Sequence, residues 1–87
     1  MEHTLQKAIN TFGEEKQKCQ AISELAELIK AITNDQTGRL DRNNIVEEIA
    51  DVKIMLMQLE IIYRITEDEM NSEMTWKIDR LKKRLGE

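Results

Sequence analysis

The chain has 87 residues, enough for one domain, and a domain of this size buries only about two thirds of the surface that its unfolded chain exposes. No apolar stretch approaches the roughly 20 residues that span a bilayer, and a net charge of −4 argues against general affinity for nucleic acid. We therefore expect no membrane partner, no nucleic-acid partner, and a marginal core that a second chain would help to complete.

The composition favours helices throughout. The chain has no proline and only three glycines, and most of its abundant residue types are strong helix formers. The single Cys19 cannot form an intrachain disulfide, and the N-terminus carries no secretion leader, which predicts a cytoplasmic protein. We expect one all-α domain over residues 1–87.

Four helices follow from the pattern of apolar and capping residues. The first is expected over 4–12, ending at Gly13, and the second over 14–33, before the loop "NDQTGRLDRNN". Asn44 or the slightly earlier Asp41 could cap a third helix that reaches about residue 64. Thr66 with Glu69 predicts the cap of a fourth helix, which ends near residue 85. The short connections predict an antiparallel helical bundle, completed by oligomerisation.

The second helix has two different sides. Its apolar residues gather on one side, and four mostly polar residues lie on the other: Ile22, Leu25, Ala26, Ile29 and Ile32 against Gln20, Glu24, Glu27 and Ala31. The third helix is apolar nearly all the way round, with twelve apolar residues of eighteen between Ile45 and Ile62. Such a helix is expected to be buried on every side, and Glu48 and Asp51 with it.

Each of these two helices therefore carries a pair of carboxylates three positions apart, in "ELAE" and "EEIAD". Leaving a buried carboxylate without a partner costs several kcal/mol, and no basic residue of these helices projects toward the two pairs. A single pair of this spacing is usually a solvated helix face, but the repetition on two neighbouring helices is more specific. Mg²⁺ takes hard oxygen ligands, so the pattern predicts a magnesium site.

This constellation resembles the MazG-like nucleotide pyrophosphohydrolases, a family of the all-α NTP pyrophosphatase superfamily, over nearly the whole chain. Their signature is EExxE on one helix and ExxD on the next. Glu24 and Glu27 match the second and third acids of EExxE, where Ser23 takes the first position, and Glu48 and Asp51 match ExxD. "WKIDR" further on offers Lys77 and Arg80 in place of a Lys and an Arg common on the last helix of the family.

The resemblance implies hydrolysis of a nucleoside triphosphate between its α and β phosphates, giving the monophosphate and pyrophosphate. It also implies that Glu24, Glu27, Glu48 and Asp51 bind Mg²⁺, with Mn²⁺ as a substitute, in a homodimer or homotetramer. Glu24 or Glu27 would orient or deprotonate the attacking water. Lys77 and Arg80 would hold the pyrophosphate end of the substrate.

Two other readings stay open. The chain could be a non-catalytic helical adaptor whose acidic residues bind a basic partner, or a module that senses a nucleotide without hydrolysing it. An adaptor is expected to have no saturable Mg²⁺ site, which separates it from the enzyme.

Overall fold

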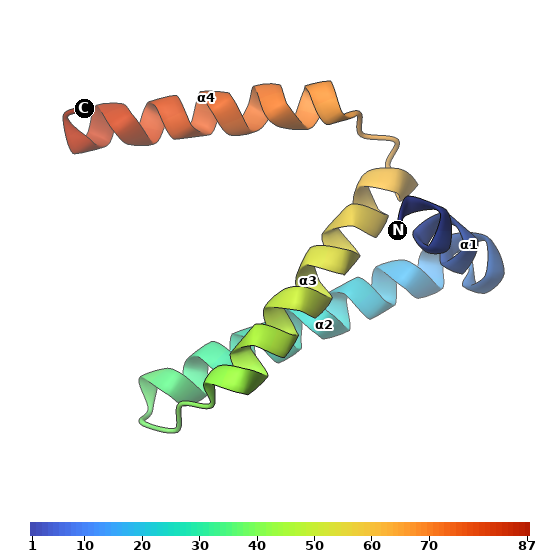
Figure 1. Cartoon of the computed structure of the whole chain (residues 1–87), viewed down its shortest axis with the longest axis horizontal. Helices are drawn as coiled ribbons and strands as arrows, with labels where there is room; N and C mark the ends of the chain where they lie inside the picture. The colour runs from blue at the N-terminus through green and yellow to red at the C-terminus, as the bar shows by residue number, and fades with distance from the viewer.

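A computed structural model describes residues 1–87 and consists entirely of helices and short connections. The helices are α1 (Glu2–Phe12), α2 (Glu14–Gln36), α3 (Arg42–Ile62) and α4 (Glu67–Leu85). The predictions of an all-α class and of four helices are confirmed. As Figure 1 shows, α2 and α3 lie side by side as an antiparallel hairpin and α1 lies near its open end, while α4 extends away.

The ends of the helices follow from local side chains. Gly13 alone joins α1 to α2, at a φ of 93° that glycine adopts without steric cost. Asp41 caps α3, because its Oδ1 accepts a hydrogen bond from the Asn44 backbone N–H at 3.1 Å. Thr66 caps α4 in the same way, accepting from the Glu69 backbone N–H at 3.1 Å. The predicted cap of α4 at Thr66 is therefore confirmed, and of the two candidates for the cap of α3 it is Asp41 that caps the helix. Helix α2 ends three residues beyond its predicted end.

The core is small and lies where α1 and α2 meet α3. Leu5 and Ile9, one turn apart on α1, are buried at this junction. The remaining buried residues come from the facing sides of α2 and α3: Gln17, Ala21, Ala31, Val52, Gln58 and Ile62. Only the packed sides of three helices contribute to the core, which is why it is so small.

The apolar stripe of α2 is not the side of that helix that packs against α3. Ala21 is 2% exposed against α3, whereas Ile22, in the apolar stripe of α2, is 67% exposed. The expectation that α3 is buried on every side is wrong for the single chain, since Ile49 and Leu56 are exposed. The reason is geometric, because a single neighbouring helix covers only one side of α3.

The direction of α4 is set by the connection between α3 and α4. The Arg64 N–H donates to the Ile61 carbonyl at 3.1 Å and the Ile65 N–H to the Glu60 carbonyl at 2.8 Å, which is a Schellman motif. Arg64 takes the left-handed conformation that this motif needs, with a φ of 56°. The Thr66 cap follows at once, and α4 then packs along none of the other helices. None of the four helices has the length and apolarity of a bilayer-crossing segment.

Candidate metal centre

Three carboxylates from two helices converge on the hairpin. Glu24 lies near the middle of α2, and Glu48 and Asp51 lie one turn apart in α3. One oxygen from each of the three lies within 4.8 Å of the others. Glu24 and Glu48 are partly buried and Asp51 is exposed, so the group opens toward solvent on the side of Asp51. We call Glu24, Glu48 and Asp51 the acidic cluster.

Glu48 is the most constrained member of the acidic cluster. Its Oε2 is inaccessible to solvent and accepts no hydrogen bond. Desolvation, together with the negative charges of Asp51, Glu27, Glu24 and Glu47, raises the pKa of Glu48 above its ordinary value. The Glu48 Oε2 therefore has no hydrogen-bond donor, and the neighbouring negative charges disfavour the ionised form of this carboxyl group.

No cation of the protein compensates this charge. The two ion pairs of the chain, Lys18 with Glu15 and Lys77 with Glu73, lie elsewhere. Glu24 accepts one hydrogen bond at 2.7 Å, from the neutral amide of Gln20 on the preceding turn. Converging carboxylates with an unpaired buried oxygen fit a hard divalent cation such as Mg²⁺, which prefers oxygen ligands and keeps several waters.

Glu27 stands beside the acidic cluster and does not belong to it. It is exposed on α2, one turn beyond Glu24, and its oxygens are not among those that converge. Its charge still contributes to the raised pKa of Glu48. Of the four carboxylates predicted from the sequence, the structure thus brings three together and leaves the fourth nearby.

Lys77 and Arg80 lie on α4, outside the hairpin. The Lys77 Nζ is 3.9 Å from a Glu73 carboxylate oxygen, and the Arg80 guanidinium stacks 4.9 Å from the centre of the Trp76 ring. Because α4 packs on neither α2 nor α3, the single chain does not bring these two cations to the acidic cluster. The physical reason is the fixed connection at Arg64, which directs α4 outward.

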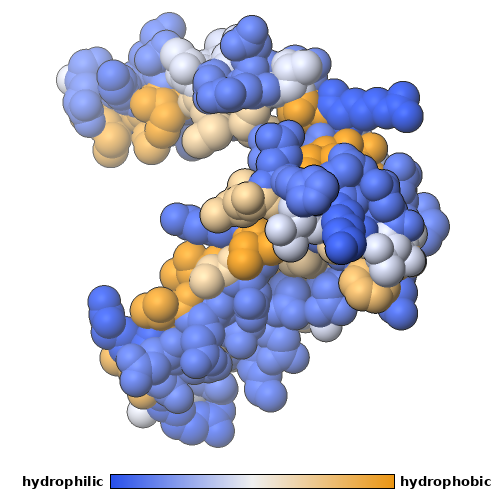
Figure 2. Space-filling view, turned by 45° about the vertical axis from the view of Figure 1, so that its right-hand side comes forward, coloured by the Kyte–Doolittle hydropathy of each residue, from blue (hydrophilic) through white to orange (hydrophobic).

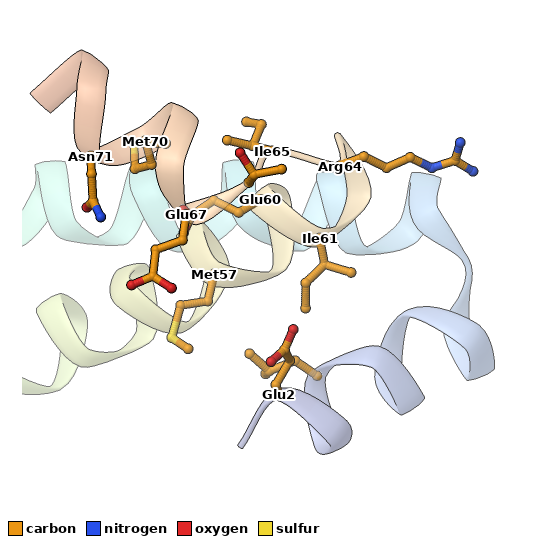
Figure 3. A pocket seen from close by; sticks show the side chains of 11 residues that line it. Glu2, Met57, Glu60, Ile61, Arg64, Ile65, Glu67, Met70 and Asn71 are labelled. Atoms are coloured by element: carbon orange, nitrogen blue, oxygen red, sulfur yellow. The ribbon is translucent and has the colours of Figure 1, made fainter.

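A hollow away from the acidic cluster was not predicted from the sequence. It has a volume of about 580 Å³ and lies where the start of α1, the end of α3 and the first turns of α4 meet. Figure 3 shows Met57 and Ile61 pointing from α3 toward Glu2 of α1, while Arg64 points away. No single helix signals this hollow, because its lining comes from three elements whose relative placement depends on the connection at Arg64.

Comparisons with protein-family models, with curated proteins and with solved structures found no match for this chain.

Proposed function

We propose that this chain is a Mg²⁺-dependent nucleoside triphosphate pyrophosphohydrolase, which cleaves its substrate between the α and β phosphates to the monophosphate and diphosphate. The observation that carries the proposal is the acidic cluster with its unpaired buried Glu48 oxygen. Its members are among the residues for which the sequence resembles the MazG-like family. The resemblance supplies the reaction, and the convergence of the carboxylates supports a site that could serve it.

The proposed roles of the residues follow from how exposed each one is. Glu24, Glu48 and Asp51 would hold the cation, which when bound neutralises charge on the phosphates and on the diphosphate leaving group. Glu27 is exposed and outside the cluster, so its carboxylate is free to accept a proton from the attacking water. Glu24 is the other candidate for this role, with its oxygen already engaged by Gln20. Lys77 and Arg80 would bind the diphosphate end once α4 is brought to the site.

The test is release of diphosphate from a panel of ribo- and deoxyribonucleoside triphosphates with Mg²⁺ or Mn²⁺. Removing a ligand of the cation should cost several kcal/mol of transition-state stabilisation, so Glu48→Gln and Asp51→Asn should lower the rate at least about 100-fold. Glu47→Gln is the matched control, because Glu47 is the exposed neighbour of Glu48 on the same helix. Activity no higher in the wild type than in Glu48→Gln, for every nucleotide, would end the enzymatic proposal.

The position of Lys77 and Arg80 away from the cluster favours one competing function, a module that binds a nucleotide and does not cleave it. Calorimetric titration separates the cases. Saturable Mg²⁺ binding that is lost in Asp51→Asn, without cleavage of any nucleotide, would indicate sensing. Absence of a saturable Mg²⁺ site would instead indicate the adaptor.

A further inference from the structure

Helix α4 carries an apolar stripe that touches nothing in its own chain. Met74, Ile78, Leu81 and Leu85 recur at alternating steps of four and three residues, which places them on one side of the helix. All four are exposed, and α4 buries no residue at all. We call these four residues the α4 stripe. Apolar residues at such regular spacing on one side of a helix are typical of a surface that packs against another apolar surface.

The α2–α3 hairpin, residues 14–62, presents such a surface. Figure 2 shows hydrophobic side chains along the side of α4 that faces the hairpin and along the hairpin surface opposite. The exposed large apolar residues of the hairpin are Ile22, Leu25, Ile29, Ile32, Leu40, Val46, Ile49, Ile54, Leu56 and Met57. Two apolar surfaces of one chain therefore face a common open space.

The amount of exposed surface is that of a chain lacking a partner. The accessible surface is 7075 Å², whereas a compact monomer of 10.2 kDa exposes about 5,300 Å². The radius of gyration is 15.9 Å, against about 12 Å for a compact chain of this length. The excess of about 1,800 Å² exceeds the roughly 800 Å² that each partner buries in a standard interface, and it falls in the range of obligate homodimers.

Closure of α4 onto its own hairpin conflicts with the connection at residues 63–66. The Schellman motif at Arg64 and the Thr66 cap follow one another without a free residue between them. Folding α4 back would require a change in this connection, which these hydrogen bonds oppose. The connection therefore favours a partner for the α4 stripe from outside the chain.

Charge identifies the partner surface. The second half of α4, from Lys77 to Arg84, has five basic residues and one acidic residue, and Lys77, Lys82 and Arg84 flank the α4 stripe. Two α4 helices packed in parallel on each other would place these cations side by side, which is unfavourable. The hairpin has ten acidic and six basic residues, so it is the surface of opposite charge.

We infer that α4 of one copy packs its stripe on the α2–α3 hairpin of a second copy, in a reciprocal exchange that forms a two-fold homodimer. Exchange leaves the Arg64 connection intact and covers both the α4 stripe and the apolar surface of the hairpin. The inferred dimer does not depend on whether the protein is an enzyme. If the proposed function also holds, the exchange carries Lys77 and Arg80 onto the hairpin of the neighbouring copy.

The first test introduces a charge into the α4 stripe. Sedimentation equilibrium of the wild type should give twice the chain mass of 10.2 kDa, and Leu81→Glu should give a monomer that keeps its helical circular dichroism. Ser72→Glu, at an exposed position on the other side of α4, adds the same charge and should remain dimeric. A monomeric wild type, or a Leu81→Glu variant that remains a dimer, would overturn the inference.

The second test separates the hairpin from α4 itself as the contact surface. Reversing two flanking charges in Lys82→Glu/Arg84→Glu should raise the dissociation constant at least about tenfold at low salt, because a complementary contact becomes a repulsive one. In a parallel pair of α4 helices the reversed charges would instead meet Lys77, and the dimer would be unchanged or tighter. That outcome would overturn the inference.

A third measurement holds even if a variant fails to fold. An exchanged dimer should have a melting temperature that rises over about a hundredfold increase in wild-type protein concentration, because dissociation and unfolding are coupled. A monomer with a free α4 should show no such rise. A melting temperature independent of concentration would therefore contradict the exchange without reference to any substitution.

Discussion

At the scale of single residues, Glu48 is the group whose state depends most on what occupies the site. Its Oε2 is cut off from water and accepts no hydrogen bond, and its neighbours are negative. The folded protein without metal therefore holds the proton of Glu48 more tightly than the unfolded chain does. Stability from this group is full below the ordinary pKa of 4.5 and is lost as the pH rises through the raised folded pKa.

Glu48→Gln should accordingly raise the melting temperature of the metal-free protein at neutral pH, since it removes a poorly solvated charge. The gain should disappear near about pH 4, where both side chains are neutral. Melts in chelator across this pH range measure it, with Glu47→Gln as a variant that should gain much less, because Glu47 is exposed and its charge is the smallest of the causes that raise the pKa of Glu48. Equal melting temperatures of wild type and Glu48→Gln at neutral pH would count against a desolvated Glu48.

Which carboxylates meet was only partly predictable from spacing. A separation of three residues places Glu48 and Asp51 on one side of α3, so their proximity follows from the sequence. Glu24 and Glu27 have the same spacing, yet only Glu24 joins the acidic cluster. The difference depends on how far α2 is shifted along α3, and the spacing of residues within one helix carries no information about that shift.

At the scale of elements, the contact between α2 and α3 relies on small side chains. Ala21 is 2% exposed and Ala31 is 4% exposed, so neither leaves room for a larger residue. Small residues at these positions let the two helices approach closely. That approach brings Glu24 near Glu48.

Ala21→Leu should therefore destabilise the protein by about 1–3 kcal/mol, because added methylenes must displace α3. Urea unfolding at a fixed protein concentration measures the change. Ser23→Leu, on an exposed position of the same helix, should stay within about 0.5 kcal/mol of the wild type. A loss no greater in Ala21→Leu than in Ser23→Leu would indicate that the hairpin is more loosely packed than the structure describes.

The ends of the elements were better predicted than their faces. Thr66, Gly13 and Gly86 act through bonds and dihedral angles within a few residues, so the sequence specifies them locally. The apolar stripe of α2 predicts that Ile22 and Ile29 pack against a partner, but it does not say whether that partner is the next helix or another chain. In the structure it is the other side of α2, with Ala21 and Ala31, that contacts α3.

At the scale of the whole molecule, the open shape and the uncompensated acidic cluster both mean that binding of a partner or a cation should stabilise the fold. A cation that binds the folded state alone stabilises it by about 2.7 kcal/mol at 100 times its dissociation constant. Magnesium should thus raise the wild-type melting temperature. Differential scanning calorimetry with Mg²⁺ and with chelator measures the shift, which should vanish in Asp51→Asn and persist in Glu47→Gln. Identical wild-type curves in the two conditions would argue against a shared cation site.

The class and the number of helices were predictable from composition and capping residues, but the shape of the molecule was not. The shape depends on the four residues 63–66, and Arg64 gives no sequence signal for its left-handed conformation, which glycine or asparagine usually supplies. The left-handed Arg64 is thus part of the connection that directs α4 away from the hairpin.

The only tryptophan and the only cysteine of the chain lie on the two parts that the Arg64 connection separates. Trp76 is exposed on α4 and Cys19 is exposed on α2. Wild-type protein labelled at Cys19 with a fluorescent acceptor therefore contains a complete energy-transfer pair. Mixing labelled with unlabelled chains turns that pair into a direct optical readout of whether donor and acceptor belong to the same polypeptide.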